Sequence, residues 1–247
     1  MRWPVVSLPF LCLLALSAFA EDSAQVRVAD GFECPVGRDS SKPYYKARGF
    51  RPNGHLGEDW NGAGGGDTDF GDPVFSTAHG IVVFARDYRL GWGNVIIVRH
   101  AFMEKGQTQF VDSLYGHLNE ILVREGQAVS RGQKIGTIGN NQGMYPAHLH
   151  FELRKNIHVG MFRNSFPRDF TTYWDPTQFI AAHLSMPAGA GLLATVPTNT
   201  FPATPPPLVG TAMADSPFSH GPATVPTPLH RQTPFKVDRF SDLRSEK

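Results

Sequence analysis

The sequence predicts a β-rich single domain built on an antiparallel β-sheet core, with one short C-terminal helix and a disordered Pro-rich tail. Short runs of valine and isoleucine alternate with glycine-bearing turns between residues 73 and 154, a pattern typical of strands joined by hairpins. One helix-start signal occurs near residue 175, and more than half of the 20 prolines follow residue 186. These observations place the strands first, the helix after them and the tail last.

The first twenty residues are predicted to be a secretory signal peptide. Arg2 supplies a positive start, residues 8–16 form an apolar run, and residues 18–20 read as a small-x-small cleavage site. The apolar run is too short to span a bilayer as a mature helix, so no stable membrane anchor is expected after cleavage. The protein is therefore expected in the periplasm or cell envelope, or outside the cell. A retained N-terminal anchor is the alternative interpretation.

Composition limits the kinds of partner and the kinds of metal site. Removal of the signal peptide leaves Cys34 as a single cysteine, which excludes an internal disulfide and a multi-thiolate zinc site. We expect this thiol to be buried and inert, and pairing with another chain is the alternative. The formal net charge of +1 argues against electrostatic capture of nucleic acid. The sequence does not determine the oligomeric state, for which a monomer is the default.

The domain is expected to cover residues 33–185. Its strands are predicted at residues 73–76, 81–85, 94–100, 112–117, 128–129, 134–138 and 148–154. The helix is predicted over residues 175–184, because Asp175 can cap its N-terminus and Pro176 fits its first turn.

Residues 187–247 are predicted to form a disordered, partly extended tail. Proline removes backbone donors and restricts the backbone, and here it is interleaved with Thr, Ala, Ser and Gly. A chain that ends at Met186 is therefore expected to stay folded and soluble.

The side chains that can carry chemistry occur in three short clusters, which are His55 with Asp59, Tyr115 with His117, and His148 with His150. Residues two apart in a strand share a face, so His148 and His150 can both reach one site. Two histidines and one aspartate suit zinc and leave a fourth position for water, whose pKa zinc can lower from about 15.7 to about 7. Spacing alone leaves open which of the paired histidines binds.

Taken separately, each cluster fits ordinary surface or turn residues as well as it fits metal chemistry. Other polar residues have plainer interpretations. His100 ends an apolar run, and we expect a structural hydrogen bond there. Asp67 and Asp69 belong to a glycine-rich loop and are expected to be solvated. Residues 140–146 are expected to form a loop at the rim of the site.

The stretch from His55 to Arg154 resembles the lysostaphin-type (LytM-like, beta-lytic) zinc metalloendopeptidases. The matching segments, which occur in the family's order, are residues 55–59, 71–74, 80–82, 93–100, 115–118, 125–136 and 147–154. The resemblance covers most of the expected domain, but neither the Pro-rich tail nor the segment before residue 42.

This resemblance implies roles for individual residues. It implies that His55, Asp59 and His150 hold one Zn²⁺ per chain. It assigns His117 and His148 to catalysis, in which they activate water and stabilise the tetrahedral intermediate. It also implies a sheet that lines a narrow groove for an extended peptide.

The function expected from this resemblance is that of an exported zinc metalloendopeptidase. Its substrate would be the amide bonds of peptidoglycan cross-bridges or stem peptides. The alternative is a zinc-binding, non-hydrolytic envelope protein that activates or recruits a wall amidase, but all five site residues are present. A biotinyl-type or lipoyl-type carrier is excluded, because Lys134 lies within a predicted strand and not at an exposed hairpin tip.

Overall fold

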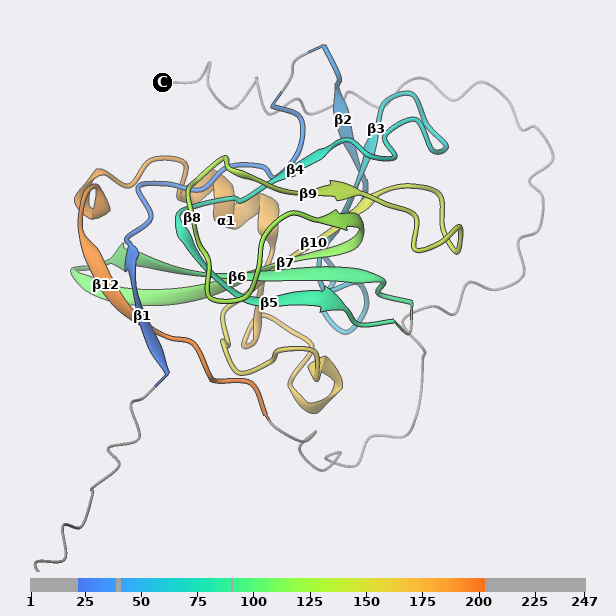
Figure 1. The fold of residues 1–247 in the computed structure, drawn as a ribbon. Coiled ribbons are helices and arrows are strands. Elements are labelled where there is room, and N and C mark those ends of the chain that lie inside the picture. Colours follow the sequence, from blue (N-terminus) through green and yellow to red (C-terminus); the bar gives the residue numbers. More distant parts are fainter. Residues whose placement is uncertain (1–21, 39–40, 90, 203–247) are drawn as a thin grey trace, which may run out of the picture.

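The computed structural model describes residues 22–38, 41–89 and 91–202. The strands are β1 (Ser23–Arg27), β2 (Tyr44–Arg48), β3 (Glu58–Gly62), β4 (Pro73–Phe75), β5 (Gly80–Asp87), β6 (Asn94–Glu104), β7 (Gln107–Ile121), β8 (Ala128–Val129), β9 (Lys134–Ile138), β10 (Leu149–Arg154), β11 (Tyr173–Trp174) and β12 (Leu193–Pro197). The helices are α1 (Pro176–Ala182) and the 3-10 turns η1 (Arg163–Ser165) and η2 (Pro187–Gly189). The predicted β-rich, antiparallel architecture is confirmed (Figure 1).

The main sheet has the strand order β2-β3-β10-β7-β6-β5-β8, and all of its pairings are antiparallel. Strands β4 and β9 join it through β7, and β11 pairs with β10. The long β6–β7 hairpin lies at the centre, β10 pairs with β7, and β3 pairs with the other edge of β10 (Figure 1). Because β3, β10 and β7 are neighbours, residues far apart in the sequence meet on one part of the sheet.

Strand β6 contains the uninterrupted apolar run at residues 95–98. Its alternate side chains enter two core clusters, since Ile96 and Val98 belong to one and Val95 and Ile97 to another. A strand that is buried on both faces is apolar at successive positions instead of every second one. Within the same strand, His100 bonds the carbonyl of His79 and the Ser113 hydroxyl, which is the structural role expected for it.

Helix α1 begins as predicted. The Asp175 side chain accepts a hydrogen bond from the backbone N–H of Gln178 at 3.0 Å, and Pro176 occupies the first turn. The helix ends at Ala182, after which His183 stacks on Phe179 with ring centroids 4.1 Å apart. No helix in the described ranges is long and apolar enough to cross a membrane.

The structure departs from the predicted boundary at residue 187. Strands β1 and β12 form a two-stranded antiparallel sheet, which brings Ser23 opposite Pro197 (Figure 1). Val26 and Val196 are buried in this sheet against Ile81 and Ala101. Proline is tolerated here because it stands at the end of a strand that pairs on one side. The predicted signal peptide (residues 1–20) and residues 203–247 of the predicted tail lie outside the described residues.

A chain that ends at Met186 should therefore be less stable than one that ends at Pro202. The shorter chain loses the burial of Val196, worth about 1.5–3 kcal/mol. It also loses the carbonyl of Pro197, which accepts a 2.6 Å hydrogen bond from the buried Arg99. We expect the free energy of unfolding in urea to fall by about 3 kcal/mol. Equal unfolding midpoints for the two chains would show that the β1–β12 sheet contributes nothing.

Candidate metal centre and catalytic cleft

Three potential metal ligands meet where β3 pairs with β10. Asp59 lies in β3 directly opposite His150 in β10, and His55 lies in the segment that leads into β3. Gly57 allows this segment to approach β10, because a Cβ there would lie 2.4 Å from the Phe151 carbonyl oxygen. The pairing of these strands therefore brings together residues that are 95 positions apart.

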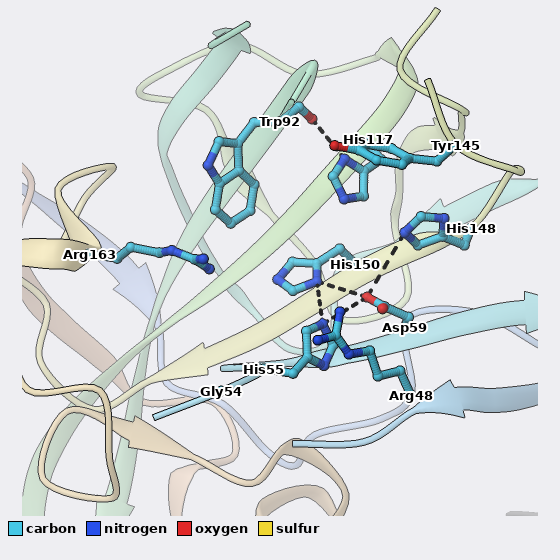
Figure 2. A pocket seen from close by; sticks show the side chains of 10 residues that line it. All are labelled: Arg48, Gly54, His55, Asp59, Trp92, His117, Tyr145, His148, His150 and Arg163. Carbon is cyan, nitrogen blue, oxygen red and sulfur yellow. Dashed lines mark hydrogen bonds and ion pairs between the residues drawn. The ribbon is translucent and has the colours of Figure 1, made fainter. Parts of the chain in front are cut away.

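The ligand atoms form a small triangle (Figure 2). His55 Nε2 lies 3.1 Å from His150 Nδ1 and 3.1 Å from Asp59 Oδ1, and His150 Nδ1 lies 2.9 Å from that same oxygen. Tetrahedral coordination with bonds of about 2.0–2.1 Å places ligand atoms roughly 3.3 Å apart. The triangle therefore fits a small divalent cation after shifts of a few tenths of an ångström.

The outer nitrogens of the two histidines orient the triangle. His55 Nδ1 donates to the carbonyl of Gly49 at 3.1 Å, and His150 Nε2 donates to the Glu152 carboxylate at 3.0 Å. When each imidazole is neutral, its other nitrogen presents a lone pair to the other ligand atoms. Three electron-rich atoms in contact with one another repel unless a cation or a proton lies between them.

The close approach of the three ligand atoms also shifts the pKa values of Asp59 and His150. Burial disfavours both the Asp59 carboxylate and the His150 imidazolium. Hydrogen bonds from His150 and His55 outweigh burial and hold the pKa of Asp59 well below its usual range. Bonds to Asp59 and Glu152 likewise raise the pKa of His150 to about 9. A metal ion that binds here would displace the proton that His150 otherwise retains.

His117 and His148 lie beside the triangle. The ring of His117 is 4.8 Å from that of His148 and 5.8 Å from that of His150, between ring centroids. His148 precedes β10 and pairs in a single bridge with Gly139, with its Nε2 4.0 Å from Asp59 Oδ1. Strand-like spacing therefore brings His148 and His150 to one cleft, as predicted.

Both of these histidines are held as neutral imidazoles. His117 Nδ1 donates to the Trp92 carbonyl at 3.2 Å, and His148 Nδ1 donates to the Pro146 carbonyl at 2.8 Å. Burial lowers the pKa of His117 well below its ordinary value and also lowers that of His148. In each ring Nε2 is then a proton acceptor at neutral pH.

His117 has a left-handed backbone conformation, with φ of 61°. It lies in β7 where the register with β9 shifts just beyond it, between Leu118 and Glu120. Its backbone N–H also donates to Trp92, at 3.0 Å. Non-glycine residues adopt this conformation rarely, and such residues are often found at functional sites. The irregularity directs a strand side chain into the cleft.

Trp92 is a wall of the cleft that sequence reasoning missed. Its ring lies nearly parallel to that of His117, at 24°, and meets the His150 ring edge-on with centroids 5.3 Å apart. Gly116 makes room for it, because a Cβ there would lie 3.3 Å from the indole. The Arg163 guanidinium lies 5.2 Å from the centre of the indole ring.

The cleft has a volume of about 110 Å³ and is lined by Arg48, Gly54, His55, Asp59, Trp92, His117, Tyr145, His148, His150 and Arg163 (Figure 2). Tyr145 comes from the loop at residues 140–146, which lies at the rim as predicted. The expectation of solvated acids is wrong for Asp69, which is buried and accepts the N–H of Gly62 at 2.8 Å. Asp67 is exposed but anchors the backbone of Ala147 at 2.7 Å.

Glu152 is the second group that sequence reasoning missed. This fully buried carboxylate accepts hydrogen bonds from His150 and Arg154 and lies 3.6 Å from Arg163. Burial alone would raise its pKa, but the positive charge of Arg154 and the bond from His150 hold it well below the usual range. Glu152 therefore fixes which nitrogen of His150 faces the other ligand atoms.

The variant Glu152→Gln should bind metal about tenfold to a hundredfold more weakly, because His150 loses a charged partner. Competition with a chromogenic zinc chelator measures this change. Glu125→Gln is the matched control, since Glu125 is exposed and pairs only with surface groups. Unchanged affinity in Glu152→Gln would mean that strand geometry alone orients His150.

Comparison with known proteins identifies the family. Residues 54–160 match the model of peptidase family M23. The lipoprotein NlpD of Yersinia enterocolitica is 42% identical over 84 residues, which cover 34% of this chain and 78% of that protein. The chain belongs to peptidase family M23. The resemblance seen in the sequence is thereby confirmed.

Other members of the family are much longer than the matched region. The peptidoglycan DD-endopeptidase ShyA of Vibrio cholerae is 41% identical over 90 residues, which cover 35% of this chain but 19% of ShyA. Among solved structures, lysostaphin from Staphylococcus simulans is 26% identical with a TM-score of 0.40, covering 60% of this chain and 52% of that one. The chain thus spans only 19% of the length of ShyA.

Proposed function

We propose that this M23 protein is an exported, zinc-dependent endopeptidase that hydrolyses amide bonds in peptidoglycan peptides. One observation carries the proposal. Two neutral imidazoles, His117 and His148, lie on the same cleft as a triangle of potential metal ligands. A site that only stored or sensed a metal would need the triangle but not the two proton acceptors beside it.

His55, Asp59 and His150 would hold one zinc ion per chain. Two nitrogens and one oxygen suit zinc, and three protein ligands are typical of its catalytic sites, whereas structural sites usually have four. When bound, zinc supplies a Lewis acid that polarises a carbonyl group and makes water acidic. The small triangle and the bonds that orient its imidazoles support this assignment.

His117 and His148 would transfer the protons. With Nδ1–H committed to a backbone carbonyl in each ring, Nε2 can accept a proton from the attacking water. The imidazolium formed can then donate a hydrogen bond to the oxyanion and pass the proton to the leaving nitrogen. Trp92 and Tyr145 would exclude bulk water from the two rings.

Peptidoglycan is proposed as the substrate on the strength of the family and of the relative named as a peptidoglycan DD-endopeptidase. The direct test is digestion of purified sacculi of several cross-link types, followed by amine quantification and mass analysis of the fragments. We expect new amines to appear only when zinc is present. Absence of zinc-dependent release from every wall type would contradict the proposal.

A second candidate is the activation of a separate wall hydrolase. The relative that supports it is the murein hydrolase activator NlpD of Escherichia coli, 40% identical over 84 residues. The two candidates separate when His117 is replaced. An endopeptidase loses its activity on sacculi in His117→Asn, whereas an activator still stimulates the release of fragments by an added amidase.

A further inference from the structure

The walls of the cleft carry two arginines that the proposed reaction does not use. Arg48 ends β2 and Arg163 begins η1, and both line the cleft. Figure 2 shows their guanidinium groups directed toward the metal-ligand triangle from different sides. Among the described residues that line the cleft, Asp59 is the one acid, and it belongs to the triangle.

Arg163 is a fixed and only partly compensated charge. It is largely buried, its guanidinium lies near the face of Trp92, and its closest acid is Glu152 at 3.6 Å. Glu152 is already bonded to His150 and Arg154. One carboxylate is thus shared by three positively polarised groups, which leaves the cleft on this side electropositive.

Arg48 is an exposed charge without a partner in the part of the chain that the structure describes. Nearby lysines are engaged, since Lys46 pairs with Glu58 at 3.0 Å and Lys42 with Asp72 at 2.6 Å. The register of β2 against β3 shifts between Lys46 and Arg48, so that Arg48 pairs with Asp59. A β-bulge changes the direction in which the following side chain points. The shift at this position accompanies the placement of Arg48 in the lining of the cleft.

We propose that Arg48, with Arg163 on another wall, forms a carboxylate-binding subsite. The preferred substrate is then a peptide with a free carboxylate next to the scissile amide, in preference to an uncharged glycine bridge. This inference rests on the proposed function, because it assigns the substrate class of the same cleft. A guanidinium binds a carboxylate through two parallel hydrogen bonds, which gives orientation as well as affinity.

Two fluorescent peptides test the subsite, identical except that one has a carboxylate and the other a carboxamide beside the scissile bond. Their dissociation constants are measured by fluorescence anisotropy on the zinc-loaded mature chain carrying His117→Asn, in which turnover is suppressed. We expect the carboxylate peptide to bind about tenfold more tightly. This preference should weaken as salt is added.

Adding Arg48→Gln should reduce the preference for the carboxylate peptide to within about twofold. Arg48→Lys should retain part of this preference, because lysine keeps the positive charge but cannot form the two parallel hydrogen bonds of a guanidinium. Arg86→Gln is the matched control, since Arg86 is exposed on β5, pairs with Glu125 at 2.6 Å and does not line the cleft. Zinc content and thermal unfolding confirm that the variants fold.

Equal affinity for the two peptides, or a preference that survives Arg48→Gln, would overturn the inference. Binding is read without turnover, so this outcome is distinct from failure of the proposed function. If sacculi are cleaved but the peptides bind equally, only the subsite is wrong. If the carboxylate preference holds but no wall is cleaved, only the endopeptidase assignment is wrong.

Discussion

Replacing Asp59 with alanine is expected to abolish stoichiometric zinc binding and, with it, the proposed endopeptidase activity. Its Oδ1 lies 3.1 Å from His55 Nε2 and 2.9 Å from His150 Nδ1, so it completes the triangle. It also supplies the one negative charge among the three ligands. With two neutral nitrogens left, zinc affinity should fall by more than about a hundredfold. Metal analysis after dialysis measures the zinc retained per chain.

The control for this experiment is Glu125→Ala, which removes an exposed carboxylate from a surface pair. It should bind zinc as the parent protein does. Zinc should also raise the unfolding temperature of the parent, because a ligand of the native state stabilises it, and should fail to raise that of Asp59→Ala. Full zinc occupancy in Asp59→Ala would remove this residue from the metal site.

Replacing His117 with asparagine is expected to leave zinc binding intact and to lower turnover by about 10² to 10⁴. Nδ1 of His117 is held by the Trp92 carbonyl, and its neutral ring lies beside that of His148. Asparagine suits the experiment because it tolerates the left-handed backbone of this position better than alanine does. The readouts are zinc content and the rate of amine release.

His117→Gly separates the backbone from the ring. Glycine adopts a φ of 61° without strain, so any loss that it shares with His117→Asn comes from the missing imidazole. Loss of zinc in both variants would make His117 a ligand instead of a catalytic group. Undiminished turnover would leave His148 as the single proton acceptor in the cleft.

Local patterns in the sequence predicted the elements that depend on local physics. The apolar run of β6, the capped start of α1 and the two-residue spacing of His148 and His150 depend on neighbours within a few residues. Such features follow from backbone propensity, capping and strand periodicity. They were sufficient to name the candidate residues.

The sequence did not predict the β1–β12 sheet, because almost the whole domain lies between these two strands in the sequence. The segment Leu193–Pro197 lies among prolines, and its local composition favours an extended tail. It becomes a strand because Val196 is buried with Val26 and because Pro197 accepts a hydrogen bond from Arg99. Neither contact has a local signal.

The sequence by itself determined which residue types could hold a metal and move a proton, and in what order they occur. The tertiary structure decided the rest. Pairing of β3 with β10 brought His55 and Asp59 to His150, while Glu152 and backbone carbonyls selected the nitrogen that each ring presents. Only the fold brought Arg48 and Arg163 to the same cleft. The physical reason is that these residues are far apart along the chain. Their hydrogen bonds and charge interactions form only after folding, and the local sequence of one segment contains no information about its partner.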